Sequence, residues 1–275
     1  MKAFWKITTN VVLLLLFISF FPPAQAANST TVRVAFAENN PPYQFVNREG
    51  EPEGLFIDLM DELARRGDLE VVYVPFRTSI ACNQAFGKGE VDIVLGLDTM
   101  YSTNYGYQIT NTIFTSTFCK IGRMEIEEGK RESIAYEFAT LPTKVWGPLT
   151  NTQLLACESQ SAMLEACESN LATHLVGDKN VIMSLMEEKG ISEHYKVEIN
   201  YLADADYHII VPKGDTRLLR QLNNSINELR TGGEYEELLN FKCGGISGTA
   251  KKNRPRLRPA GTGDSGIREK WICES

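Results

Sequence analysis

The sequence predicts an α/β protein in which helices cover a mostly parallel β-sheet. Apolar residues recur at every second position in some segments and at the i, i+3, i+4, i+7 spacing of an amphipathic helix in others. These strand-like and helix-like segments alternate, and the alternation occurs twice along the chain. With 275 residues, 43% of them hydrophobic and 23% charged, the chain can bury a core as ordinary globular proteins do.

The first α/β unit extends to about residue 97. Val32, Val34 and Phe36 alternate with polar neighbours, which predicts a strand. The strand expected at 91–97 is mostly apolar, as in strands that are buried on both faces. The expected strands of this unit are 31–37, 44–46, 69–76 and 91–97, and its expected helices are 55–67 and 78–86.

The second α/β unit follows a strand expected at 113–121 and a charged stretch, 125–132, which we expect to form a surface loop. No segment rich in Pro, Gly or Ser separates the two units. This favours two packed lobes with strand-like crossovers over independent domains on a linker. The expected strands after the loop are 144–147, 173–177, 195–202 and 207–213, and the expected helices are 150–169, 180–188, 216–230 and 234–241.

The amino terminus is typical of a secretory signal peptide. Lys2 and Lys6 precede an apolar stretch at 11–21, and Ala24-Gln25-Ala26 supplies small residues for cleavage. The apolar stretch is shorter than the about 20 residues that a membrane span needs. We therefore expect a signal peptide at 1–26, cleavage near Ala26 and a periplasmic protein, with an uncleaved membrane anchor as the alternative.

The sequence holds six cysteines, all after the expected cleavage point. An even number of cysteines in an oxidising compartment predicts disulfides, although spacing leaves their pairing open. Cys157 and Cys167 lie on one expected helix, about 15 Å apart, so they should not pair with each other unless that helix is broken. Residues 246–275 are basic, with almost no apolar pattern, and we expect a disordered tail.

The charge distribution argues against several other functions. The formal charge is −7 and the body carries no basic stripe, so we expect no binding to nucleic acid. There is no Cys-x-x-Cys pair and no Cys/His cluster, so we expect no metal site and no cofactor. No Ser/His/Asp or Cys/His arrangement can be assembled, so we name no catalytic residue.

Several short motifs occur in a set order over most of the chain. They are Asn40-Pro41-Pro42-Tyr43-Gln44-Phe45, Gly54-Leu55-Phe56-Ile57-Asp58-Leu59, Gly89-Glu90-Val91-Asp92-Ile93-Val94, Val176-Gly177-Asp178 and Gly232-Gly233-Glu234-Tyr235. From about Val32 to about Lys242, the chain resembles the extracellular solute-binding proteins of the polar amino-acid transporter type, family 3. The resemblance implies the type II periplasmic-binding-protein fold, in which two α/β lobes are joined by two hinge strands and hold a solute between them.

The same resemblance implies how the chain is divided and what it meets. Lobe I is expected to comprise 30–115 and 214–245, and lobe II 116–213. The implied partners are a small polar solute and an ABC permease of the inner membrane, and the protein is expected to be a monomer. The position of the cleft also follows from physics, because ligands of open α/β sheets lie beyond the carboxyl ends of the strands.

The resemblance implies a set of ligand-binding residues. Relatives that bind amino acids use a lobe I arginine for the solute carboxylate, but here that position is Asn104, and no arginine lies between Arg77 and Arg123. Asp178 matches the carboxylate that binds the solute amine, and Thr99 matches a hydroxyl contact. The expected ligand-binding residues are Asn40, Tyr43, Arg77, Thr99, Asn104, Thr150 and Asp178.

Most of these residues have a structural alternative. Asp178 could cap the following helix, and Tyr43 could belong to the core. Arg77 is either a solvated surface charge or a relocated partner for an anion. Thr150 either caps the expected helix or helps its free N–H groups to bind an anion.

We therefore expect an exported protein that captures a small polar, amine-bearing, amino-acid-like solute for an ABC-type importer. One alternative is an extracytoplasmic sensing module that would be the remnant of a larger sensor. A second alternative is an exported dehydratase-like enzyme on the same fold, for which a single carboxylate in the cleft would be compatible but not sufficient.

Overall fold

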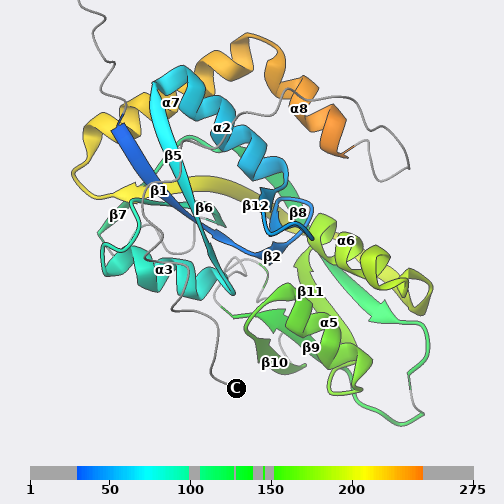
Figure 1. Ribbon diagram of the computed structural model, residues 1–275. Helices are drawn as coiled ribbons and strands as arrows, with labels where there is room; N and C mark the ends of the chain where they lie inside the picture. The colour runs from blue at the N-terminus through cyan, green and yellow to red at the C-terminus, as the bar shows by residue number, and fades with distance from the viewer. Residues whose placement is uncertain (1–29, 99–105, 127, 139–144, 146–151, 244–275) are drawn as a thin grey trace, which may run out of the picture.

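The structure is a computed structural model, in which two groups of helices and strands are connected by two long strands (Figure 1). The described residues are 30–98, 106–126, 128–138, 145 and 152–243. Outside them lie the expected signal peptide, the expected tail, most of the strand expected at 144–147, and three expected site residues, Thr99, Asn104 and Thr150.

The first group of elements, here called the first lobe, is built on a parallel sheet. Strand β1 (Thr30–Ala37) pairs with β5 (Leu69–Phe76) on one side and with β6 (Ile93–Asp98) on the other. One helix, α3, covers one face of this sheet, and α2, α7 and α8 lie over the other (Figure 1). The helices are α2 (Leu55–Gly67), α3 (Ser79–Gly87), α7 (Thr216–Thr231) and α8 (Glu234–Cys243).

A small three-stranded sheet lies between β1 and α2. It consists of β2 (Asn39–Asn40), β3 (Gln44–Val46) and β4 (Pro52–Glu53), which pair in antiparallel order. The sheet carries the chain from the carboxyl end of β1 to the start of α2, and so places the loop 41–43 at the edge of the first lobe.

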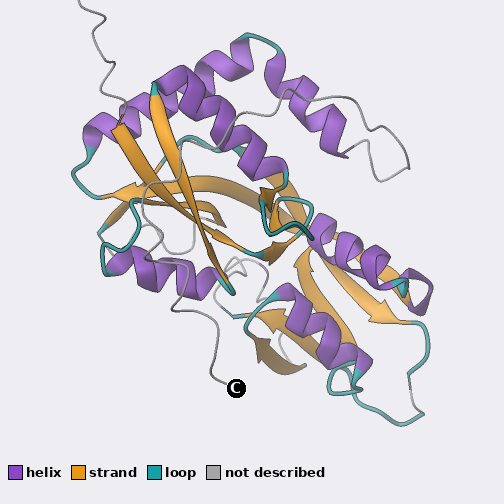
Figure 2. Cartoon of the chain, in the orientation of Figure 1, coloured by secondary structure: helices purple, strands orange, loops and turns teal. Residues whose placement is uncertain are grey.

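The second group, here called the second lobe, has its own parallel strands. Strand β9 (Ser133–Glu137) lies between β10 (Gln153–Cys157) and β11 (His174–Asp178), and all three run in the same direction. Helices α5 (Gln160–Glu168) and α6 (Lys179–Lys189) complete the lobe. Figure 2 shows both lobes as alternating helices and strands.

Two long antiparallel strands connect the lobes. Strand β8 (Phe114–Arg123) pairs with β11, and β12 (Tyr195–Pro212), which follows the short helix η3 (Ser192–His194), pairs with β6 and β7 (Tyr107–Ile109). The described strands form a sheet in the order β10-β9-β11-β8-β12-β6-β1-β5, with β7 attached to β12. This architecture confirms the expected fold class, a two-lobed α/β protein with two connecting strands.

The prediction of one helix over 150–169 is wrong. The chain forms strand β10 first, and α5 begins only at Gln160, after Ser159 accepts a hydrogen bond from the Ala162 N–H group as its N-cap. The exposures along β10 alternate only weakly, as on a sheet edge, so its short apolar run was mistaken for helix. Because Cys157 lies on a strand, the helical separation from Cys167 does not exist.

The disulfide prediction is wrong for four of the cysteines. Cys82, Cys119, Cys157 and Cys167 are free thiols. Burial raises the pKa of the Cys82, Cys119 and Cys167 thiols to about 12, so these three stay protonated at neutral pH. They behave as small core residues rather than as cross-links.

Two further strands differ from expectation. Strand β9 was not expected, because its five residues follow directly on a charged stretch. The strands expected at 195–202 and 207–213 are one continuous strand, β12. Within it Ala203 and Ala205 are buried while Asp204 faces solvent, so the acidic residues do not interrupt the strand.

Candidate functional site

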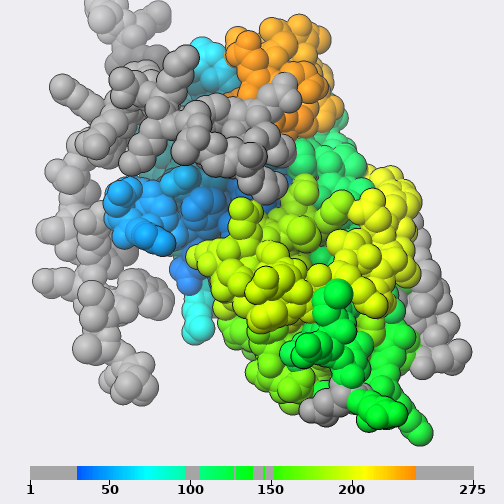
Figure 3. Space-filling view, turned by 90° about the vertical axis from the view of Figure 1, so that its right-hand side faces the viewer, coloured from blue at the N-terminus to red at the C-terminus, as the bar shows by residue number. Residues whose placement is uncertain are grey.

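The parallel strands of both lobes end at the region where the lobes meet. Asp178 ends β11 and Glu137 ends β9, and both side chains are buried. Helix α5 contacts β2 of the first lobe. Figure 3 shows the blue amino-terminal segment of the first lobe directly against the green residues of the second. The region between the lobes is therefore the place where both sheets present their carboxyl ends.

Tyr43 is held in this region by the backbone of its own loop. The Phe56 N–H group donates to the Tyr43 carbonyl oxygen at 2.7 Å. A Cβ at Gly54 would lie 2.3 Å from that same oxygen, and Gly54 has a φ of +127°, so only glycine fits there. The Tyr43 ring stacks on Phe56 with the centroids 4.6 Å apart, and it tilts against Phe114 and Tyr207. The Gly54 motif thus serves to position Tyr43.

Asp178 is the centre of a buried hydrogen-bond network. Its Oδ1 accepts from the Tyr43 hydroxyl at 3.0 Å, and its Oδ2 accepts from the Tyr207 hydroxyl at 2.8 Å. The Asn180 and Val181 N–H groups, at 2.9 and 3.1 Å, also donate to Oδ1, so Asp178 caps α6. The carboxylate therefore joins the first lobe, a connecting strand and a helix of the second lobe.

Burial and hydrogen bonding shift the pKa of Asp178 in opposite directions. Burial raises the pKa of Asp178, while hydrogen bonds from Ser116, Tyr207, Val181 and Tyr43 partly offset the rise. Burial, followed by the Asp178 charge, raises the pKa of Tyr43 well above its usual value, so its hydroxyl remains a donor. The Asn180 side-chain amide then donates to the Tyr43 oxygen at 3.0 Å and to the Ser116 hydroxyl at 3.2 Å.

Glu137 is a second buried carboxyl group in the same region, and it is not among the ligand-binding residues expected from the sequence. It is 7% exposed, and the Ser79 side chain at the start of α3 is a hydrogen-bond partner. Burial and then the charge of Asp178 raise the pKa of Glu137 to about 8, while the Ser79 hydrogen bond acts to lower it. Glu137 went unnoticed because strand β9 was not predicted, so no strand end was expected there.

Three buried side-chain amide oxygens in the described residues have no hydrogen-bond partner: Gln44 Oε1, Asn83 Oδ1 and Gln160 Oε1. Gln160 is the first residue of α5 and is 8% exposed. A Cβ at Gly177 would lie 2.7 Å from its Oε1, so the glycine leaves room for this oxygen beside Asp178. Buried acceptors are nearly always paired, and an unpaired one indicates a missing donor.

The structure brings together only part of the expected site. Tyr43 and Asp178 are in direct contact, and Asn40 lies in β2, paired with Gln44 and half-buried. Arg77 is exposed just after β5. The remaining three expected residues are among those that the structure does not describe. The ligand-binding roles of all seven stay predictions.

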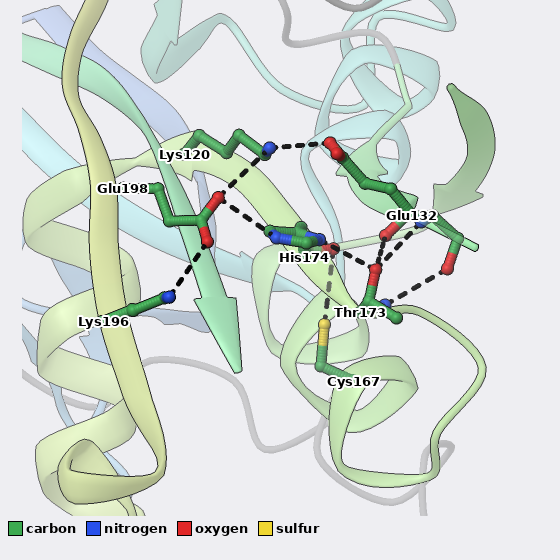
Figure 4. Close-up of polar contacts among 8 residues, drawn as sticks. Lys120, Glu132, Cys167, Thr173, His174, Lys196 and Glu198 are labelled. Carbon is green, nitrogen blue, oxygen red and sulfur yellow. Dashed lines mark hydrogen bonds and ion pairs between the residues drawn. The ribbon is translucent and has the colours of Figure 1, made fainter. Parts of the chain in front are cut away.

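A separate polar cluster lies at the opposite, amino-terminal ends of β9 and β11 (Figure 4). Glu198 is bonded there to Lys120 at 3.2 Å, to His174 Nε2 at 3.1 Å and to Lys196 at 3.6 Å. Thr173 Oγ1 lies 2.8 Å from His174 Nδ1. A Cβ at Gly122 would come within 2.8 Å of both Glu198 and His174, so these two side chains pack directly against the glycine.

Neither a metal-binding cluster nor a helix suited to cross a membrane occurs among the described residues. No group of three or more His, Cys, Asp or Glu side chains within them could hold a metal ion. Among the same residues, no helix combines the length and the apolar character that crossing a membrane would need.

Comparison with known proteins places the chain in a family. Residues 32–241 match the family described as "Bacterial extracellular solute-binding proteins, family 3". A "Probable histidine-binding protein" of Neisseria gonorrhoeae is 23% identical over 232 residues, covering 78% of this chain and 84% of that protein. The "ABC transporter glutamine-binding protein GlnH" of Bacillus subtilis (strain 168) is 20% identical over 200 residues, covering 69% and 72%.

Solved structures share the fold at low sequence identity. A histidine kinase sensor domain with similarity to periplasmic binding proteins has a TM-score of 0.70 at 17% identity, covering 78% of this chain and 97% of that domain. The family match spans most of the chain and agrees with the strand order and the paired lobes described above. The chain therefore belongs to the family 3 bacterial extracellular solute-binding proteins.

Proposed function

We propose that this protein is exported and captures a small polar, amine-bearing, amino-acid-like solute for an ABC-type importer. The observation that carries the proposal is the meeting of buried polar side chains from both lobes at the carboxyl ends of their strands, where Tyr43 contacts Asp178. Open α/β sheets bind ligands at such ends. The relatives named for histidine and glutamine binding support an amino acid as the solute class.

The proposal includes closure of the lobes around the solute. Residues 30–115 and 214–245 would move as lobe I against 116–213 as lobe II, with β8 and β12 as the hinge. Hinge closure buries a ligand and excludes water, which strengthens the polar contacts inside the cleft.

The proposal also includes a compartment and partners. The basic and apolar segment that ends near Ala26 supports export to the periplasm. The partner would be an ABC permease of the inner membrane, and the binding protein would act as a monomer without a cofactor. The solute carboxylate would be bound by polar groups other than an arginine at position 104, with Arg77, Thr99 and Thr150 as candidates.

Calorimetric titration of the mature chain, residues 27–275, tests this function. The ligands are the common L-amino acids, the polyamines putrescine and spermidine, and small organic acids. We expect saturable binding of at least one amine-bearing compound and none of a plain organic acid. Binding of only anionic acids, or conversion of a prephenate-like acid to a product, would contradict an amine-binding importer component.

Sensing is the second candidate, and the likeness to a kinase sensor domain is the observation that keeps it in view. Transport and sensing predict the same ligand but different partners. Uptake of radiolabelled solute into cells should require the binding protein and its permease if the importer proposal holds. Unchanged uptake in a deletion strain, with altered solute-dependent gene expression, would favour sensing.

A further inference from the structure

Asp178 is the expected partner for a solute amine, but the protein already uses its oxygens. Two backbone N–H groups of α6 and the hydroxyls of Tyr43, Tyr207 and Ser116 donate to it. A carboxylate offers about four acceptor positions. The residue is 0% exposed, so an incoming amine would have to displace donors that hold the two lobes together.

Glu137 occupies the neighbouring strand end. The register that pairs Val176 with Tyr136 places the next residues of the two strands, Gly177 and Glu137, side by side. Because Gly177 has no side chain, side chains from other elements fill the space above it, among them Gln160 of α5. Glu137 also reaches the first lobe through Ser79, so it lies between the lobes rather than deep within one of them.

An acceptor oxygen without a donor lies over the same strand ends. Gln160 Oε1 approaches the Cβ position of Gly177 to 2.7 Å, is buried, and has no hydrogen-bond partner. Its residue is more than nine-tenths buried. A neutral amide oxygen in such a place lacks an N–H donor, and a nitrogen cation would supply one.

The first lobe also has a buried acceptor oxygen without a hydrogen-bond partner, on Asn83 of α3. Asn83 lies one helical turn after Ser79, so the two residues share a face of α3. The buried Oδ1 of Asn83 has no hydrogen-bond partner. The first lobe thus carries a buried acceptor on the same helix face as Ser79, the hydrogen-bond partner of Glu137.

We propose that Glu137, and not Asp178, binds the positively charged ammonium or guanidinium group of the solute, with Gln160 Oε1 as a second acceptor. This inference rests on the proposed function, because it needs an amine-bearing solute between the lobes. Asp178 then has a positioning role: it caps α6 and orders Tyr43. The arrangement selects solutes by a nitrogen cation with more than one N–H group, such as a primary ammonium.

The pH dependence of binding follows from the groups around Glu137. These are Asp178 on β11, Cys157 on β10 and Ser79 on α3. The pKa of Glu137 is raised to about 8, so the unliganded carboxyl is mostly protonated at neutral pH. A cation binds the ionised form and releases a proton. Affinity should therefore rise from about pH 6 to about pH 8 by up to roughly tenfold per pH unit, and then level off.

The test is calorimetry on the mature chain with L-lysine, L-arginine, L-histidine, L-glutamine and the uncharged analogue N-acetyl-L-glutamine amide. Titrations at about pH 6, 7 and 8.5, in two buffers of different ionisation enthalpy, give affinity and protons released. Glu137→Gln should weaken binding of the cationic solute by about tenfold to a hundredfold. It should also abolish the pH dependence and the proton release.

Two variants serve as controls. Glu198→Gln makes the same change at the far end of the lobe and should leave affinity and proton release unchanged. Gln160→Leu removes the second acceptor and should weaken binding by several-fold while the proton release remains. Thermal unfolding without ligand checks that each variant folds.

The outcomes separate the two proposals. Wild-type binding that keeps its affinity and its pH dependence in Glu137→Gln overturns the role of Glu137 and leaves the proposed function standing. Failure of every amine-bearing compound to bind the wild-type protein overturns both. Binding of the uncharged analogue as tightly as the amino acids would contradict the selection of a cation.

Discussion

The two ends of the second lobe's parallel strands treat buried charge in opposite ways. At the amino ends, Glu198 faces Lys120, Lys196 and His174 (Figure 4). Burial alone would raise the pKa of Glu198, but the hydrogen bond from Lys120 and the interaction with His174 lower it below its usual value. The protein supplies its own counter-charges here.

At the carboxyl ends of the same strands, the pKa of the buried glutamate is shifted the other way, upward. Burial and the charge of Asp178 raise the pKa of Glu137, and Asp178 itself is held by hydroxyl and N–H groups rather than by a cation. An ion pair that is complete within the protein is a structural feature. A buried carboxyl group whose ionised form is disfavoured gains the most from a cation that binds beside it, and its raised pKa marks Glu137 as a candidate site for a solute cation.

Asp178→Ala, at the carboxyl ends of the strands, should cause the largest loss in the free energy of unfolding. It removes the acceptor of three buried hydroxyls and two helix N–H groups. Unsatisfied buried donors and a lost cap together should lower the free energy of unfolding by about 3–5 kcal/mol. Urea unfolding measures the loss. Asp178→Asn, which keeps one acceptor oxygen, should cost less; a loss below about 1 kcal/mol for the alanine variant would show that the network is not needed for stability.

Gly122→Ala should disturb the amino end to a smaller extent. The new Cβ would lie 2.8 Å from Glu198 Oε1 and 2.8 Å from the His174 ring, so both side chains must move apart. Overpacking of this kind costs about 1–3 kcal/mol in the free energy of unfolding. Gly87→Ala is the matched control, since its Cβ would meet only the Tyr107 hydroxyl at an ordinary 3.6 Å. Equal losses in the two variants would refute the close packing over Gly122.

Much of the fold could be predicted from the sequence, because long periodic segments carry a strong signal. The i, i+3, i+4, i+7 spacing from Phe56 onward predicted α2, and the alternation from Val32 predicted β1. Two strands that the sequence did not predict, β9 and β10, have only five residues each. A strand of this length shows barely two periods, so its existence is decided by its pairing partners rather than by its own pattern: β9 pairs with β11 and β10, and β10 pairs with β9.

The site was predictable only in part, for a related reason. Tyr43 and Asp178 belong to recognisable motifs, so they could be selected before their contact was known. Glu137 belongs to no motif, and its importance comes from burial and from the strand register beside Gly177. Neither property can be obtained from the residue type alone, since most glutamates are exposed.

Glu137→Gln should stabilise the unliganded protein, which is the opposite of what Asp178→Ala does. The pKa of Glu137 is raised to about 8 from 4.5, so ionisation disfavours the folded state. The penalty is absent below about pH 4.5, grows between the two values and is complete above about pH 8. After local relaxation we expect a gain of about 1–2 kcal/mol at pH 8.5 and almost none at pH 4. A destabilised variant at pH 8.5 would contradict the raised pKa.

Glu198→Gln should show the opposite pH dependence with a smaller size. The pKa of Glu198 is lowered, so its contribution to stability is present above its unfolded value of about 4.5 and is lost as the pH falls through the folded value. Because the carboxylate is partly exposed, the loss at neutral pH should be about 0.5–1 kcal/mol and should shrink in high salt. Urea unfolding of both Glu→Gln variants from about pH 4 to 8.5 compares the two ends directly. If the curves change in the same direction with pH, the two ends do not differ in how they balance charge, and the case for a solute cation beside Glu137 loses its electrostatic support.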